Sequence, residues 1–143
     1  MTSNEKFLYE TSAINKDGVN GASYIDRKDG LKVTVSSPLN DSPGTNPEEL
    51  LGLSLSTCFN ATIHAMLKDQ NLTNQSKVEV PVQLKKEPNE PGYYFEVEVR
   101  ASIEDLPIEQ AADIIELSST RCPVFKLVQG SHTVSLKTVP YTK

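Results

Sequence analysis

The sequence is poor in cysteine and lacks tryptophan: Cys58 and Cys122 are the only cysteines among 143 residues. A chain of this length is expected to form one domain, residues 1–143, whose core needs no disulfide staples. Residues 1–10 are polar and acidic and lack the apolar segment of a secretory signal. We therefore expect a cytoplasmic protein in a reducing compartment, where two cysteines more often carry redox chemistry than a structural bridge.

Two further absences narrow the range of partners. The sequence has no dense cluster of lysine and arginine, and its net charge is −5, so we expect no binding to nucleic acid. The longest apolar stretch, 50–67, is interrupted by Gly, Ser, Thr, Asn and His. It is typical of a core helix rather than a membrane span, and we expect no membrane partner.

Metal-ligand spacing is also missing. The two cysteines and two histidines form no CxxC or HxxxH cluster. His64 follows Cys58 by six residues, on a different helical face, and is typical of a core histidine or a pocket wall. His132 is typical of a surface position. The sequence predicts no metal site.

What the sequence does contain is a long apolar helix around Cys58, with the sequence TNPEELLGLSLSTCFNATIHAML over 45–67. Thr45 or Asn46 can cap its N-terminus, and Pro47 suits the first turn. Two acidic residues follow, where the helix dipole favours negative charge. The other residues are apolar, small or weakly polar. A helix without a polar face is expected to be buried on most sides in the centre of the fold.

The two cysteines allow two interpretations. A buried cysteine in an apolar helix is most often a small inert hydrophobe, and this applies to Cys58 taken alone. Cys122, however, stands just before Pro123 in RCPVFKLV, near a helix N-terminus whose partial positive charge favours a thiolate. Arg121 adds to that effect. Two candidate thiols on two helices suggest a dithiol/disulfide pair.

The order of the elements predicts an α+β fold. Alternating apolar and polar residues indicate strands, and a stripe from Ile108 to Leu117 indicates a second helix opened by Pro107. Pro81 lies inside the expected strand over 78–84, which favours an edge strand or a bulge at that place. The expected strands are 7–12, 22–25, 31–35, 78–84, 93–103 and 133–139, and the further helices are 108–121 and a short turn or helix over 122–129. This order is typical of a mostly antiparallel sheet packed with helices.

Two blocks of the sequence resemble one protein family. GTNPEELLGLSLSTCFNA, over 44–61, is similar to the active-site helix of the OsmC/Ohr family of organic hydroperoxide reductases, and RCPVFKLVQG, over 121–130, is similar to its second cysteine block. The 64-residue separation of Cys58 and Cys122 also fits, and the resemblance covers nearly the whole chain. It implies the OsmC-like fold: antiparallel sheets wrapped around a long buried central helix and a second helix, in an intertwined homodimer.

The resemblance also implies a thiol-dependent peroxidase with a role in oxidative stress resistance. Cys58 would attack the peroxide and become a sulfenate, and Cys122 would resolve it to a disulfide. The family prefers organic and lipid hydroperoxides, is reduced by dithiols such as dihydrolipoyl groups, and needs no cofactor. The apolar pocket would include Leu55 and Phe59. Phe125 replaces the family's usual serine. It either lines the pocket near Cys122 or is an ordinary packing residue.

The sequence departs from the family at one point. An apolar pocket raises a thiol pKa, and the family offsets this with an arginine held by a glutamate. Glu48 matches the glutamate of the family's Asn-Pro-Glu block, but the turn over 15–21 contains no arginine. The candidate replacements are Lys16, Arg27 and Arg121. Lysine lacks arginine's planar fork, so a weakened or differently tuned peroxidase is expected.

The spacing of Glu48 and Cys58 indicates a dimer independently of the family resemblance. Ten residues correspond to roughly 15 Å along a straight helix and about 80° around it. Glu48 therefore cannot easily touch the thiol of its own chain. If both belong to one site, Glu48 reaches Cys58 of a second subunit, and the sites lie at a homodimer interface.

Two other functions fit the same residues. A non-catalytic binding protein would use the apolar pocket for an acyl or lipid ligand and keep its cysteines inert, so Cys58→Ser would retain function. A redox sensor would pass its disulfide to another protein. Peroxide turnover with a dithiol reductant distinguishes both from a peroxidase.

Overall fold

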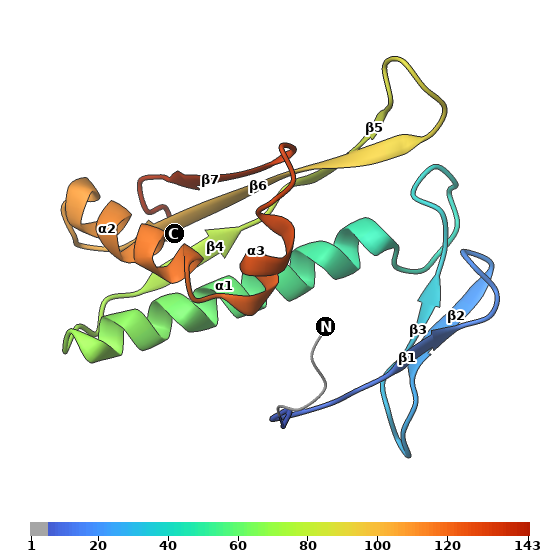
Figure 1. Cartoon of the computed structure of the whole chain (residues 1–143), viewed down its shortest axis with the longest axis horizontal. Coiled ribbons are helices and arrows are strands. Elements are labelled where there is room, and N and C mark those ends of the chain that lie inside the picture. The colour runs from blue at the N-terminus through green and yellow to red at the C-terminus, as the bar shows by residue number, and fades with distance from the viewer. Residues whose placement is uncertain (1–5) are drawn as a thin grey trace. The chain divides into compact units, whose positions relative to one another are not determined.

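The computed structural model describes residues 6–143, and the chain forms two compact units that divide between Pro47 and Glu48. Figure 1 shows the elements of each unit. The first five residues belong to the stretch on which the expected lack of a secretory signal depends, and they lie outside this description.

The first unit contains a three-stranded antiparallel sheet of β1 (Ala13–Asn15), β2 (Gly21–Ile25) and β3 (Lys32–Val35), in that order. The predicted turn between the first two strands is present. The Asn15 side chain closes it, because its Nδ2 donates to the Gly18 carbonyl at 2.9 Å and its Oδ1 accepts from the Gly18 N–H at 2.7 Å. Gly18 has φ of +62°, a value that glycine adopts without strain.

The predicted strand over 7–12 is wrong. Strand β1 begins only at Ala13, and Phe7 and Tyr9 are each 72% exposed. The cause is the length of the partner strand, since β2 ends at Ile25, which lies opposite Ala13. Apolar and polar residues alternate before Ala13, but the partner strand does not extend far enough to pair with them.

The second unit consists of a helix, a four-stranded sheet and two shorter helices (Figure 1). Strand β6 is central, with β4 and β5 antiparallel along one edge and β7 parallel along the other. The elements are α1 (Pro47–Asp69), β4 (Ser76–Glu79), β5 (Val82–Lys86), β6 (Tyr93–Ile103), α2 (Ile108–Ser119), α3 (Pro123–Val128) and β7 (Val134–Thr138). The predicted α+β class and most element positions are confirmed.

The strand predicted over 78–84 is split in two at Pro81. Strands β4 and β5 pair with β6 in one continuous register, Glu79 opposite Arg100 and Val82 opposite Val97. Proline has no N–H to give the ladder, while its carbonyl still accepts from Glu98 at 3.2 Å. The edge position expected for this segment is confirmed.

Helix α1 begins at Pro47, so Asn46 occupies the capping position. The prediction that it is buried on most sides is wrong for the single chain, since Leu53 is 63% exposed and Ala61 and Ala65 are also exposed. The sheet and α3 meet only one stripe of the helix. By length and composition α1 would also qualify as a membrane span, a test that core helices pass as well. Its buried stripe is Leu55, Phe59, Ile63, Met66 and Leu67.

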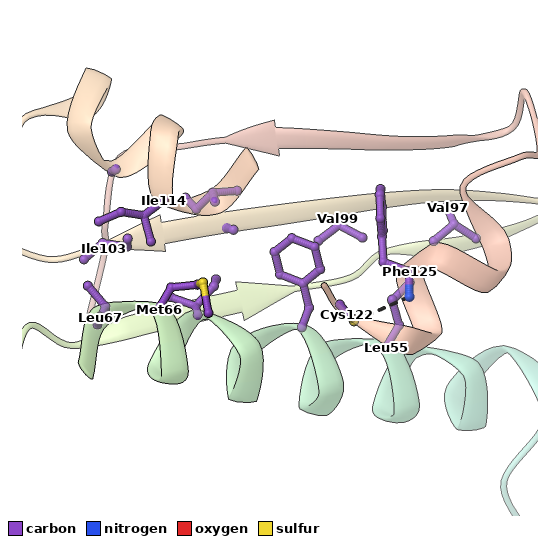
Figure 2. Close-up of a cluster of buried hydrophobic side chains, with 14 residues drawn as sticks. Leu55, Met66, Leu67, Val97, Val99, Ile103, Ile114, Cys122 and Phe125 are labelled. Atoms are coloured by element: carbon purple, nitrogen blue, oxygen red, sulfur yellow. Dashed lines mark hydrogen bonds between the residues drawn. The ribbon is translucent and has the colours of Figure 1, made fainter. Parts of the chain in front are cut away.

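The core of the second unit lies between this stripe, the inner face of β6 and the two shorter helices (Figure 2). Helix α2 contributes Ala111, Ile114 and Ile115. Two residues of its predicted stripe are exposed instead, Ile108 at 45% and Leu117 at 39%. Helical spacing from Ala111 places Leu117 outside the buried face, whereas Ile108 lies on the side of that face but is the first residue of the helix.

Candidate functional site

The two cysteines lie next to each other, although they are 64 residues apart in the sequence. Helix α1 carries Cys58 at a half-buried position in its middle, and Cys122 is the N-cap residue of α3. Their Sγ atoms are 3.3 Å apart. A disulfide needs about 2.05 Å, so the bond requires an approach of roughly 1.2 Å. The site can therefore exist as a dithiol or a disulfide with little movement.

The two thiols differ in exposure. Cys122 has no exposed surface, whereas Cys58 is partly exposed. Burial raises the pKa of the Cys122 thiol, and the Phe125 backbone N–H, which donates to its Sγ at 3.4 Å, opposes that rise. A protonated Cys122 donates a hydrogen bond to the Cys58 sulfur. Of the two sulfurs, only that of Cys58 belongs to a residue with exposed surface.

A pair of aromatic rings lies beside the sulfurs, and sequence reasoning missed it. The rings of Phe59 and Phe125 meet edge to face, with centroids 5.5 Å apart and an interplanar angle of 78°. Figure 2 shows Phe125 rising from α3 toward Val97, with Leu55 below it. Phe59 follows Cys58 directly, and this adjacency was the one available signal. Which partner the ring would meet depends on packing between segments far apart in the sequence.

Glu48 does not join the thiols within one chain. It lies in the first turn of α1, and the helix runs unbroken from there to Cys58, a rise of roughly 15 Å. Glu48 lines a separate cavity of about 560 Å³ between α1 and strands β4 and β5, together with Leu53 and Val80. The distance argument made from the sequence therefore holds.

The three candidate cations are all exposed. Lys16 lies in the turn between β1 and β2, and Arg27 in the turn between β2 and β3, both in the first unit. Arg121 belongs to the same unit as the thiols and directly precedes Cys122. Within residues 6–143 its side chain forms no ion pair. Exposure leaves each of these cations free to turn toward a ligand or a second subunit.

A cavity of the second unit has a volume of about 730 Å³. Its apolar walls come from α1, β6 and the end of α3, and its polar rim comes from the segments before β6 and β7. Of the predicted pocket residues it includes Leu55, whereas Phe59 and Phe125 belong to the core. Neither cysteine lines it, though Leu55 precedes Cys58 by one helical turn. The lining includes Leu51, Leu55, Phe95, Val97, Val128 and His132.

No group of three or more His, Cys, Asp or Glu side chains in residues 6–143 is placed to hold a metal ion. His64 is exposed, so the core position expected as one of its two roles is wrong, and it borders an open hollow on α1 with Asn60 and Ala61. His132 is exposed, as predicted, in the turn before β7.

Residues 39–137 match the sequence model of OsmC-like proteins. The chain belongs to the OsmC family. Both cysteines and both halves of the ring pair fall inside the matched range, and the resemblance seen in the two cysteine blocks is confirmed. The OsmC-like fold is likewise confirmed by the solved structures it resembles.

Among solved structures, a candidate redox protein from Lactobacillus casei is 41% identical, with a TM-score of 0.87 and 98% of this chain and 96% of that chain covered. The organic hydroperoxide resistance protein OhrB of Bacillus subtilis has a TM-score of 0.82 at 26% identity, with 94% and 100% covered. An organic hydroperoxide resistance protein-like sequence of Staphylococcus aureus is 29% identical over 131 residues, 90% of this chain and 93% of the relative.

Proposed function

We propose that this OsmC-family protein is a cysteine-based peroxidase that reduces organic hydroperoxides to alcohols and contributes to resistance against oxidative stress. The observation that carries the proposal is the 3.3 Å separation of the Cys58 and Cys122 sulfurs. Inert cysteines have no need of such proximity. The names of the Bacillus and Staphylococcus relatives, which refer to organic hydroperoxide resistance, support the substrate class.

The reaction proceeds in three steps. The Cys58 thiolate attacks the peroxide oxygen, the O–O bond breaks, the alcohol leaves with a proton, and Cys58 becomes a sulfenic acid. The Cys122 sulfur then attacks the sulfenic sulfur, and the hydroxyl leaves as water with the Cys122 proton. A dithiol of the dihydrolipoyl type reduces the resulting disulfide by thiol–disulfide exchange. Every electron passes through sulfur, so the cycle needs no cofactor.

The substrate preference follows from the surroundings of Cys58. The cavity of about 730 Å³ begins one helical turn from this residue, at Leu55, and its walls are mainly apolar. An organic group is stabilised there by roughly 25 cal/mol per Å² of buried apolar surface. Hydrogen peroxide has no such group and gains nothing from these walls. The proposal therefore favours organic over inorganic peroxides.

The proposed working unit is a homodimer in which Glu48 of one subunit approaches Cys58 of the other. An uncovered face of α1 supports it: Ser54, Thr57, Ala61 and Ala65 are small and exposed, and Leu53 is 63% exposed. Small side chains let two helices approach closely. Lys16, Arg27 and Arg121 are the cations proposed to steady the Cys58 thiolate. The proposed location is the cytoplasm.

Turnover of cumene hydroperoxide with dihydrolipoamide as reductant tests this function. The expected result is multiple turnover with cumene hydroperoxide and a value of kcat/KM at least tenfold lower for hydrogen peroxide. A protein that consumes neither peroxide with any dithiol is not a peroxidase. Equal kcat/KM for both peroxides would refute the role given to the apolar cavity.

A second function, non-catalytic binding of an acyl or lipid ligand, is favoured by one observation: neither cysteine lines the large cavity. In that case a fluorescent fatty acid binds with the same Kd to the wild type and to Cys58→Ser, and no peroxide is consumed. The peroxidase proposal instead expects Cys58→Ser to abolish all turnover.

A further inference from the structure

Helix α3 packs on the core chiefly through one buried side chain, with Val124 and Val128 partly buried beside it. The helix has six residues, Pro123–Val128, and Phe125 is the only one of them that is buried, with 6% of its surface exposed. Lys126 is exposed and Leu127 is 83% exposed. A helix this short has little stability of its own. The placement of its first turn, next to the buried Cys122 at its N-cap, therefore depends largely on where the Phe125 ring is held.

The Phe125 ring is held by the helix that carries the other thiol. It meets Phe59 at a centroid distance of 5.5 Å and an angle of 78°, the edge-to-face geometry in which aromatic rings attract each other. Phe59 has no exposed surface and follows Cys58 in the chain. The Phe125 backbone N–H donates to the Cys122 sulfur at 3.4 Å. Phe59 is thus the chain neighbour of one of the two cysteines, and Phe125 is linked to the other by the hydrogen bond from its backbone N–H.

We propose that Phe125 is a positioning residue for disulfide formation: its ring contact with Phe59 holds the Cys122 sulfur within bonding reach of Cys58. The inference rests on the proposed peroxidase function and adds a residue to it. The ring itself touches no reacting atom. The family resemblance places serine at this position, so the ring contact is a feature of this sequence rather than of the resemblance.

The step affected is the second one of the cycle. The Cys122 sulfur forms a bond to the Cys58 sulfur, the S–O bond of the sulfenic acid breaks, and the hydroxyl leaves as water with the Cys122 proton. The first step, in which Cys58 is oxidised by the organic hydroperoxide, forms no bond to Cys122 or to a residue of α3. Because a misplacement of about 1 Å can slow a step by on the order of 100-fold, loss of the ring should slow closure and leave sulfenic acid formation unchanged.

Rapid quenching of single turnovers measures both steps in one experiment. Reduced protein is mixed with one equivalent of cumene hydroperoxide, and sulfenic acid is trapped with dimedone while free thiols are alkylated and counted by mass spectrometry. Phe125→Ala is expected to form sulfenic acid at the wild-type rate and to close the disulfide about 10- to 100-fold more slowly. Phe125→Leu keeps most of the buried volume without the ring edge. Its rate of disulfide closure is expected to lie between those of the wild type and Phe125→Ala.

Lys126→Ala is the matched control, because it alters an exposed residue of the same helix and should match the wild type in both steps. A purely structural role for Phe125 lowers the melting temperature but leaves the ratio of the two rates unchanged. Closure within twofold of wild type in a folded Phe125 variant overturns the proposal. If Phe125→Ala fails to fold, Phe125→Leu decides the question by the same criterion.

A peroxide-free assay separates this inference from the proposed function. Oxidised glutathione forms a mixed disulfide with Cys58, and Cys122 then displaces glutathione to give the same intramolecular disulfide. If the wild type ignores hydroperoxides, the peroxidase proposal fails, but slow closure from the mixed disulfide in Phe125→Leu still supports the positioning role. Wild-type closure rates in that assay contradict the positioning role alone.

Discussion

At the scale of single residues, the two cysteines have identical side chains and different surroundings. Cys58 keeps part of its surface open, whereas Cys122 is fully buried and its burial raises its pKa. A protonated, enclosed thiol reacts poorly with a substrate from solution, because the thiolate is the nucleophile. In the proposed cycle, these surroundings favour Cys58 for the first attack and Cys122 for the resolving step.

The Cys122→Ser variant tests this division of roles. A serine cannot resolve the Cys58 sulfenic acid, so this variant should react once with cumene hydroperoxide, accumulate sulfenic acid and show no turnover with dihydrolipoamide. Cys58→Ser should show neither the first reaction nor turnover. Dimedone labelling followed by peptide mapping reads out both variants. Sulfenic acid on Cys122 in the Cys58→Ser variant, formed at the wild-type rate, would reverse the assignment.

At the scale of the elements, a network of charged side chains links β6 to β7 on the face of the sheet away from the core. The Glu98 carboxylate accepts from Arg100 Nε at 3.1 Å and pairs with Lys137 Nζ of β7 at 3.5 Å. The hydrogen bond from Arg100 lowers the pKa of Glu98, and Lys137 acts in the same direction. The parallel edge strand is thus fixed by an ion pair as well as by its backbone ladder.

The lowered pKa of Glu98 predicts how stability changes with pH. A carboxyl group with a lower pKa in the folded state stabilises the fold above its unfolded pKa, about 4.5, and loses that contribution as pH falls through the folded pKa. Glu98→Gln should therefore lower Tm modestly at pH 7, since exposed pairs contribute little, and the difference from wild type should shrink at pH 3. A difference that grows on acidification would contradict this arrangement.

Helices were easier to predict than strand ends. Capping residues, a proline in the first turn and apolar spacing are local features, so α1 and α3 begin at Pro47 and Pro123 as expected. Strand limits depend on a partner: the segment before Ala13 alternates without one, and Pro81 interrupts a ladder that continues on both sides of it. The pairing of the cysteines was suggested by their being the only two thiols and was implied by the resemblance, since contacts across 64 residues leave no local trace.

At the scale of the whole molecule, α1 has more apolar surface than one chain covers. Its sequence has no polar face, yet residues on the side away from the sheet are exposed, among them Leu53, Ala61 and Ala65. The expectation of a fully buried helix was derived from composition, which does not say whether the cover comes from the same chain. In the proposed homodimer, a second copy of the chain supplies this cover.

Analytical ultracentrifugation tests the proposed dimer. The wild type should sediment as a dimer of the 15.7 kDa chain. Ala61→Arg places a charge on the uncovered face of α1 and should shift the protein to monomer with loss of peroxidase turnover, because Glu48 then has no Cys58 to approach. Asp113→Arg, at an exposed position of α2, should leave the dimer intact. A fully active wild-type monomer would refute both the dimer and the shared site.

The redox pairing of Cys58 and Cys122 is the central claim, and a mass measurement tests it most directly. Fully reduced protein is treated with one equivalent of cumene hydroperoxide, quenched with an alkylating agent, digested and analysed. The account predicts the loss of two hydrogen atoms from the intact chain, no alkylation at either cysteine, and a peptide pair joined through Cys58 and Cys122. Complete alkylation of both cysteines after exposure to the peroxide would contradict it.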